Sequence, residues 1–128
     1  MKILVTGGAG FIGSWVAEQY ACEGHQVTVF DNFSSGLIEN LRYAGEAVRI
    51  AEGDMCNYEQ LRAAMKGQDF VSHHAAQLEI TTAIESPQRD AHVNIIGSLN
   101  VLRAMKDEGI RRAVFASSAC VYPELRKD

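Results

Sequence analysis

A glycine-rich turn between a short apolar segment and a helical pattern constrains this chain more than any other feature. Residues 3–6 are apolar or β-branched, which is typical of a buried strand in a parallel sheet. Glycines follow at positions 7, 8, 10 and 13, and we call residues 7–13 the glycine turn. Large apolar residues then recur with helical spacing and predict one apolar helix face, formed by Phe11, Ile12, Trp15, Val16 and Tyr20.

The glycine spacing matches the requirements of a dinucleotide diphosphate. Gly8, Gly10 and Gly13 satisfy Gly-x-Gly-x-x-Gly, and Gly7, Gly10 and Gly13 satisfy Gly-x-x-Gly-x-x-Gly. Glycine permits a tight turn, close approach of backbone to phosphate, and close packing of helix on strand. The N–H groups at the helix start then offer a partial positive charge to the phosphates. Asp31 lies 18 residues beyond Gly13, where a carboxylate can bind ribose hydroxyls.

The composition fits a single soluble domain and argues against several other classes. The chain has 128 residues, of which 47% are hydrophobic and 22% charged. Its formal charge of −4 gives no electrostatic reason to expect nucleic acid or an anionic membrane as a partner. No arginine or lysine occurs at positions 32–36 to receive a 2′-phosphate, so NAD is favoured over NADP.

The three cysteines and the N-terminus point to a reducing compartment. Cys22, Cys56 and Cys120 are odd in number, far apart and without the spacing of metal ligands. We therefore expect reduced thiols, no metal site and a cytoplasmic protein. No signal peptide precedes the first expected strand, and no apolar run approaches the ~20 residues of a membrane span.

Strand and helix patterns alternate along the chain, which predicts an α/β fold with a doubly wound parallel sheet. Further strands are expected at residues 26–30, 47–51, 69–73 and 112–116. Right-handed crossovers give the strand order 3-2-1-4-5, which reverses between strands 1 and 4. Ligands of such sheets bind at that reversal, beyond the carboxyl ends of the strands. The residues that follow strand ends include the glycine turn, Asp31, Asp54, Ala75, Ala76 and Ser118.

Three helical segments and one loop are expected between the later strands. A short polar helix ends near Gly45, and Asn57 caps the next helix with Gln60 as its capping-box partner. A polar loop reaches Pro87, and a long helix then spans residues 88–108 before Gly109 ends it. The inward stripe predicted for this long helix consists of Ile95, Leu99, Leu102 and Met105.

Six segments, read in order, resemble the extended short-chain dehydrogenase/reductase family, in particular its NAD-dependent nucleotide-sugar epimerases and dehydratases. They are LVTGGAGFIGS, VFDNFSSG, GDM at 53–55, HHAAQ, VNIIGSLNVL and FASSACVY. The resemblance implies a Rossmann fold, NAD as cofactor and a nucleotide sugar as substrate. The implied reaction passes through transient hydride transfer to NAD+, and UDP-sugar 4-epimerisation is favoured.

The resemblance also implies roles for particular residues. At the diphosphate and the adenosine it implies Gly7, Gly10, Phe11, Ile12 and Gly13, then Asp31, Asn32, Ser34, Ser35 and Gly36, with Asp54 and Met55 beside the adenine. Along the rest of the cofactor it implies Ala75, Ala76 and Gln77, with Asn94 facing the nicotinamide half. Ser118 would hydrogen-bond the substrate hydroxyl, although a strand-end serine that satisfies backbone groups is the simpler alternative. We interpret His73 and His74 as residues that close a strand, not as bases or metal ligands.

One departure from the family concerns the catalytic pair. The family uses a Tyr-x-x-x-Lys pair on the helix after the fifth strand, where the lysine lowers the tyrosine pKa. This chain ends at Asp128, before that helix should begin. We therefore expect residues 1–128 to be an incomplete NAD-binding domain, from a fragment or a shortened natural chain, that does not turn over alone. A full-length relative would often be a homodimer, with the helix at 88–108 in the interface.

Two alternatives to a 4-epimerase remain open. The run Ser-Ala-Cys-Val-Tyr-Pro resembles the corresponding segment of GDP-mannose 3,5-epimerase, in which the cysteine acts as an acid/base on the sugar ring. Cys120 would then take that role, unless it is simply a small buried residue. The other alternative is a non-catalytic NAD-binding module that acts as a redox sensor or regulatory subunit.

Overall fold

The computed structural model describes residues 1–45, 48–118 and 121–123, and within them a five-stranded sheet forms the centre. The strands lie in the order β3-β2-β1-β4-β5, and every neighbouring pair is parallel. This confirms the predicted fold class and strand order. The strands span Lys2–Thr6 (β1), Gln26–Asp31 (β2), Val48–Glu52 (β3), Phe70–His73 (β4) and Ala113–Phe115 (β5).

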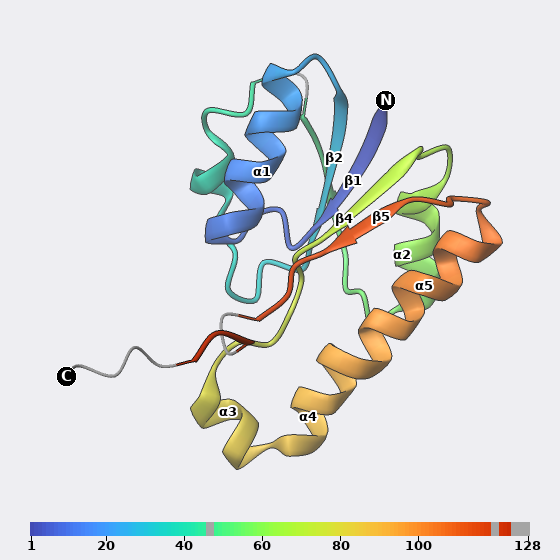
Figure 1. Ribbon diagram of the computed structural model, residues 1–128. Coiled ribbons are helices and arrows are strands. Elements are labelled where there is room, and N and C mark those ends of the chain that lie inside the picture. The colour runs from blue at the N-terminus through green and yellow to red at the C-terminus, as the bar shows by residue number, and fades with distance from the viewer. Residues whose placement is uncertain (46–47, 119–120, 124–128) are drawn as a thin grey trace.

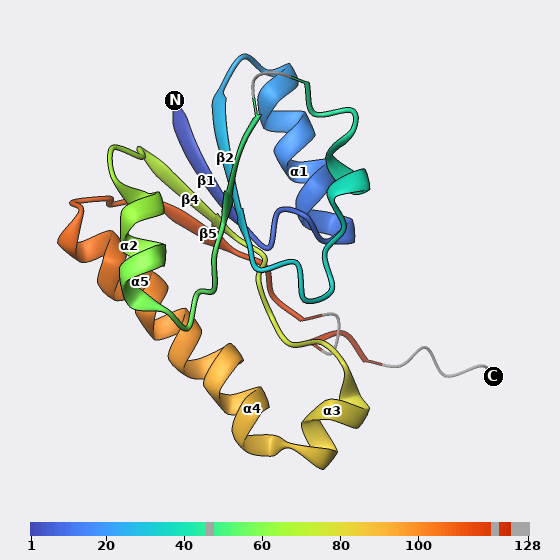
Figure 2. The same cartoon turned by 180° about the vertical axis from the view of Figure 1, so that it is seen from behind.

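Helices cover both faces of the sheet (Figures 1 and 2). One face carries α1 and the 3₁₀ turn η1, and the other carries α2 and α5. Beyond the carboxyl ends of the strands lie α3 and α4, which continue through a π-helical segment, η2, into α5. The bounds are Phe11–Cys22 (α1), Ile38–Leu41 (η1), Tyr58–Met65 (α2), Ile80–Glu85 (α3), Pro87–Ala91 (α4), His92–Gly97 (η2) and Ser98–Asp107 (α5).

Alternation along β1 divides the core into two layers. Successive side chains of a strand point to opposite faces, so Leu4 packs on one side while Ile3 and Val5 pack on the other. All three side chains are fully buried. The layer around Leu4 includes Leu61 and Met65 of α2, and it also includes residues of α5. The other layer includes residues of α1 and β2. A strand buried on both faces explains why residues 3–5 form an uninterrupted apolar run.

The predicted apolar face of α1 is wrong at the start of the helix, although Tyr20 near its end packs against the core as expected. Phe11 and Trp15 are 81% and 64% exposed, and Ile12 is also exposed, whereas the buried residues of α1 are Gly13, Ser14 and Ala17. The cause is close packing, because the glycine turn holds the start of α1 against the sheet. A Cβ at Gly13 would overlap the carbonyl oxygen of Gly7. Only small residues fit on that face, so the large apolar side chains lie on the outer side.

The long helix extends as predicted, but its inward stripe is largely wrong. Ile95, Leu99 and Leu102 are exposed, and of the four predicted residues only Met105 is buried. The face that packs inward instead carries Gly97, Val101 and Ala104. A Cβ at Gly97 would lie 2.9 Å from the Met55 side chain, so a small residue is needed where the long helix packs against the loop after β3.

Smaller differences from the sequence concern the connecting segments. Residues 80–85 form the short helix α3 where a polar loop is predicted. The short polar helix before Gly45 is a single 3₁₀ turn, η1. Gly109 has φ of 73° and ends the long helix as expected. The expected strand at 47–51 is found at Val48–Glu52, and residue 47 lies outside the described residues. No helix within the described ranges is long and apolar enough to cross a membrane.

Candidate functional site

A groove of about 380 Å³ lies at the carboxyl edge of the sheet, between the loops after β1, β2 and β3 and the segment that leads into α4. This volume falls within the range of small-molecule sites, roughly 300–1,000 Å³. Most of the residues implied for cofactor binding line it. They are Gly7, Gly10, Asp31, Asn32, Ser34, Ser35, Gly36, Asp54, Met55, Ala75, Ala76 and Gln77.

The glycine turn forms the floor of the groove because its backbone approaches the loop after β4. Gly7 has φ of 67°, a left-handed conformation that favours glycine. A Cβ on Gly7 would lie 2.5 Å from the backbone nitrogen of Ala75. The N–H of Gly10 donates to the carbonyl oxygen of Gly7 at 3.1 Å, which closes the turn. No side chain caps the start of α1, so its first N–H groups remain available to an anion.

Asp31, at the end of β2, is hydrogen-bonded directly to the glycine turn. Its Oδ2 accepts the Ala9 N–H at 2.9 Å, and its Oδ1 accepts the Phe33 N–H at 2.9 Å. The carbonyl oxygen of Ala9 is also held, by the Leu37 N–H and the Asn40 amide at 3.0 and 2.8 Å. A carboxylate has about four acceptor sites, so Asp31 retains capacity for two hydroxyls. The turn and the carboxylate therefore form one rigid unit.

Asp54 forms a second carboxylate on the groove, next to Asn32. Its Oδ2 accepts from the Asn32 amide at 3.1 Å and its Oδ1 accepts the Cys56 N–H at 2.8 Å. Burial opposes the charged form of Asp54, but these hydrogen bonds outweigh it and hold the pKa of Asp54 below its usual value. Burial and the charge of Asp54 raise the pKa of Cys56 to about 11, so that thiol stays protonated at neutral pH.

Asn57 caps α2 as predicted, but the capping box is incomplete. The Asn57 Oδ1 accepts the Gln60 N–H at 3.2 Å. The Gln60 side chain, in contrast, accepts the N–H of Asp54 at 3.1 Å. Gln60 therefore holds the groove loop after β3 in place, and does not complete the cap of α2.

Asn94 lies behind the groove wall and binds the backbone of Gln77. The Asn94 Oδ1 accepts the Gln77 N–H at 2.8 Å, and its Nδ2 donates to the Gln77 carbonyl at 3.0 Å. The same Nδ2 also donates to Asp90 at 3.0 Å. Asn94 is not among the residues that line the groove. Its place supports a role in shaping the wall formed by Ala75, Ala76 and Gln77.

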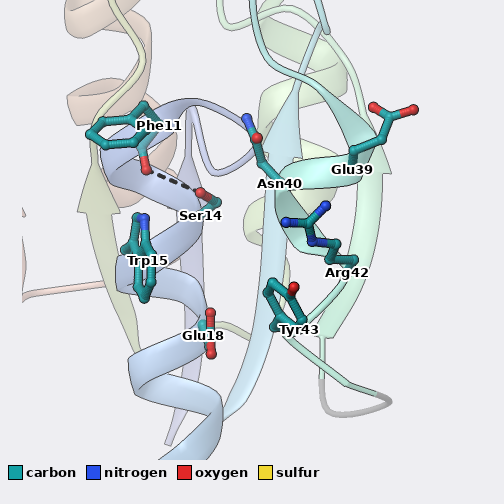
Figure 3. Close-up of a pocket in the computed structure, with 8 residues that line it drawn as sticks. All are labelled: Phe11, Ser14, Trp15, Glu18, Glu39, Asn40, Arg42 and Tyr43. Carbon is teal, nitrogen blue, oxygen red and sulfur yellow. Dashed lines mark hydrogen bonds between the residues drawn. The ribbon is translucent and has the colours of Figure 1, made fainter.

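Three other implied residues, Phe11, Ile12 and Gly13, do not line the groove. Figure 3 shows the Phe11 side chain at a separate hollow between α1 and η1, together with Trp15 and Tyr43. The Ser14 hydroxyl donates to the Phe11 carbonyl there at 3.0 Å. The Phe11 side chain therefore lines this hollow and not the groove. Gly13 contributes the close contact with Gly7 described above.

The two implied catalytic residues are at or beyond the end of β5. Ser118 is exposed, and its carbonyl oxygen accepts the Val121 N–H at 3.2 Å. Ser118 does not line the groove. Cys120 lies outside the described residues, so its proposed acid/base role stays a prediction.

His73 is the last residue of β4 and His74 follows it directly, as interpreted from the sequence. His73 is buried, and burial together with the neighbouring His74 lowers the pKa of His73 to about 4. Burial also lowers the pKa of His74, whose Nε2 lies 2.8 Å from the Ser72 hydroxyl. Among the described residues, no group of three or more His, Cys, Asp or Glu side chains could hold a metal ion.

Several residues on the groove are absent from the sequence prediction. They are Phe30, Gly53, His74, Leu78, Glu79, Thr82, Arg89 and Val93. Some could have been found from chain position, because Gly53 and His74 directly precede predicted residues. Arg89 and Val93 come from the long helix and face the groove one turn apart. The helix pattern alone does not reveal which of its sides faces the groove.

Comparison with known proteins identifies the family. Residues 3–128 match the model of the NAD dependent epimerase/dehydratase family. The chain belongs to this family. A UDP-glucose 4-epimerase of Corynebacterium glutamicum is 37% identical to this chain. The match covers 97% of this chain and 37% of that relative. A dTDP-glucose 4,6-dehydratase of Mycobacterium tuberculosis is 33% identical over 100% of the chain and 39% of that relative.

Solved epimerase structures share the fold of this epimerase/dehydratase family member. The crystal structure of Thermus thermophilus UDP-glucose 4-epimerase in complex with NAD superposes with a TM-score of 0.84. Its sequence is 38% identical, and the match covers 92% of this chain and 38% of that one. The chain thus spans well under half the length of these relatives.

Proposed function

We propose that this chain binds NAD in the groove and is the cofactor-binding part of a nucleotide-sugar epimerase or dehydratase, with UDP-sugar 4-epimerisation the favoured reaction. The observation that carries the proposal is the 2.9 Å hydrogen bond from the Ala9 N–H to Asp31. It joins the glycine turn, which would bind the diphosphate, to the carboxylate that would bind the ribose. Family membership and the activities of the relatives support the same reaction class.

The described residues fit the diphosphate and the adenosine half of a dinucleotide. The helix start at Phe11 and Ile12 would donate N–H groups to the diphosphate. The Asp31 carboxylate would accept from the adenosine ribose hydroxyls, and Asp54 with Met55 would contact the adenine. When bound, NAD+ would supply a reversible hydride acceptor for a sugar carbon.

The sugar chemistry itself depends on residues at and beyond the end of β5. Ser118 would orient the hydroxyl of the sugar that is oxidised, and a Tyr-x-x-x-Lys pair in the natural protein would supply the base. Assignment of residues 1–128 as a single NAD-binding domain belongs to the same proposal.

Charge supports NAD over NADP. A 2′-phosphate would bring about −2 of charge close to the carboxylate of Asp31, which is buried, and near that of Asp54. Residues 32–36 include no lysine or arginine that could compensate the negative charge of a 2′-phosphate. The groove therefore favours a ribose whose hydroxyls are free to donate hydrogen bonds to Asp31.

The activity is tested with the natural protein that carries this chain, incubated with UDP-galactose while UDP-glucose is followed. We expect interconversion without net consumption of NAD, and loss of activity in Ser118→Ala. Conversion of dTDP-glucose instead would shift the assignment to a dehydratase. Epimerisation of GDP-mannose with ring-carbon deuterium exchange that Cys120→Ser abolishes would favour the 3,5-epimerase alternative. NAD binding with no turnover of any nucleotide sugar would favour the sensor alternative.

A further inference from the structure

A buried histidine connects the first strand of the sheet to the long helix. His73 is 5% exposed, and both of its ring nitrogens have partners. Its Nδ1 lies 2.6 Å from the Thr6 hydroxyl on β1, and its Nε2 lies 3.2 Å from the Ser98 hydroxyl at the start of α5. The Phe115 ring packs edge-on against the imidazole, with the two ring centroids 4.8 Å apart. The proposed cofactor contacts do not use this histidine.

The direction of each hydrogen bond follows from the number of hydrogens. The Ser98 hydroxyl donates its only hydrogen to the carbonyl oxygen of Asn94 at 2.7 Å. It must therefore accept from His73, which requires a hydrogen on Nε2. A neutral imidazole carries one N–H, so Nδ1 accepts from the Thr6 hydroxyl. The protein thus fixes one tautomer of His73.

The other end of this series of bonds reaches the groove. Asn94 accepts from Ser98 through its backbone carbonyl, while its side chain makes both hydrogen bonds to the backbone of Gln77. Asn94 lies in the π-helical segment η2, and the Ser98 hydroxyl donates back to its carbonyl four residues earlier in the chain. The carbonyl that Ser98 binds and the side chain that binds Gln77 belong to one residue.

We propose that Thr6, His73, Ser98 and Asn94 form a hydrogen-bond relay that positions the Gln77 backbone on the wall of the groove. His73 and Ser98 are positioning residues, because they act through Asn94 and do not line the groove with Gln77. The relay connects the wall to the paired parallel strands β1 and β4, in which Thr6 lies opposite His73. Neighbouring residues Leu78 and Glu79 are exposed, so the wall segment has little packing of its own. Its link to cofactor affinity rests on the proposed function.

The first test measures hydrogen exchange of the Gln77 amide by NMR in the 128-residue chain. Ser98→Ala removes the acceptor of His73 and the donor to Asn94, and we expect Gln77 exchange to accelerate about tenfold or more. Ser98→Thr keeps the hydroxyl and should restore exchange to within about twofold of the wild-type rate. Thr28→Val is the matched control, because it removes a buried hydroxyl that accepts from Gln68 at 3.1 Å, in a hydrogen bond that is not part of the relay. It should leave Gln77 exchange unchanged.

Two results would overturn the relay. The first is a Gln77 amide in Ser98→Ala that exchanges at the wild-type rate. The second is a folded Ser98→Thr variant whose Gln77 amide does not return to slow exchange. A second measurement needs no variant: the ¹⁵N shifts of the His73 ring should show the hydrogen on Nε2, and a hydrogen on Nδ1 would contradict the relay.

The cofactor arm of the experiment separates this inference from the proposed function. NAD titrated into the same variants should bind about five- to tenfold more weakly to Ser98→Ala than to Ser98→Thr. If the wild-type chain binds no NAD while the exchange results hold, the proposed function fails and the relay stands. If NAD binds equally to all variants while Gln77 exchange accelerates, the relay positions the wall without affecting affinity, and its cofactor link is wrong.

Discussion

At the scale of single residues, the polar side chains of the site already form hydrogen bonds with the backbone around them. Asp31 binds the glycine turn through Ala9, Asp54 binds the loop after β3 through Cys56, and Asn94 binds Gln77. Each of these side chains is therefore pre-oriented before any ligand arrives. Pre-organisation of this kind lowers the ordering cost of binding.

Replacement of Asp31 by asparagine tests the ribose contact. The amide keeps the size of the carboxylate but loses its charge and half of its acceptor capacity. We expect NAD affinity to fall about 10- to 100-fold, since hydrogen bonds to charged groups contribute about 1.5–3 kcal/mol. The matched control is Asp69→Asn, because Asp69 also accepts a backbone N–H, from Lys2 at 2.7 Å, at the opposite edge of the sheet. Equal affinities of the two variants, measured by calorimetry, would contradict the assigned role of Asp31.

His73 predicts a pH dependence of folding. Its pKa is about 4 in the folded chain, against 6.5 for an ordinary histidine. The unfolded chain therefore binds the proton first as pH falls. The difference between the two pKa values contributes roughly 3 kcal/mol to the free energy of unfolding at neutral pH. This stability is fully present above pH 6.5 and is lost as pH falls towards 4.

The measurement compares urea unfolding of the wild type and His73→Asn between pH 7 and pH 4. The free energy of unfolding should fall more steeply with decreasing pH in the wild type, because the variant lacks this titrating group. An NMR titration of the wild-type His73 ring gives an independent check. Protonation of that ring near pH 6.5 in the folded protein would be incompatible with the buried relay.

At the scale of elements, small residues determine which helix face packs against the rest of the domain. The sequence predicts the strands well, because runs such as residues 3–6 and 26–30 are rich in apolar and β-branched residues and are followed by turn residues. The same reasoning predicts the wrong faces of α1 and α5, because both helices carry large apolar residues on an outer side. Gly13 and Gly97 mark the faces of close approach, and hydrophobic periodicity does not register them.

Stability measurements on α1 distinguish the two possible faces. Gly13→Ala places a methyl group against the backbone of Gly7, which cannot move aside as a side chain can, and should cost about 1–3 kcal/mol or more. Trp15→Ala removes a large but exposed side chain and should cost under about 1 kcal/mol. Chemical denaturation of the two variants gives both values. The opposite order would mean that the large apolar residues, and not the small ones, face the sheet.

At the scale of the whole molecule, the parallel sheet brings distant residues to one edge. The alternation of strands and helices fixes the strand order, and that order places the glycine turn, Asp31, Asp54 and Ala75 around one groove. This part of the site could be predicted because strand ends are readable from sequence. The relay through Ser98 and Asn94 could not, because it depends on the π-helical segment and on the angle at which α5 crosses the sheet.

The central claim, that the glycine turn and Asp31 together bind a nicotinamide dinucleotide, is tested most directly by calorimetric titration of this chain with NAD and with NADP. We predict a saturable heat with one NAD per chain, and an NADP affinity lower by at least about tenfold, the effect of about 1.4 kcal/mol of repulsion at the 2′-phosphate. Absence of heat from both coenzymes, or tighter binding of NADP, would contradict the account.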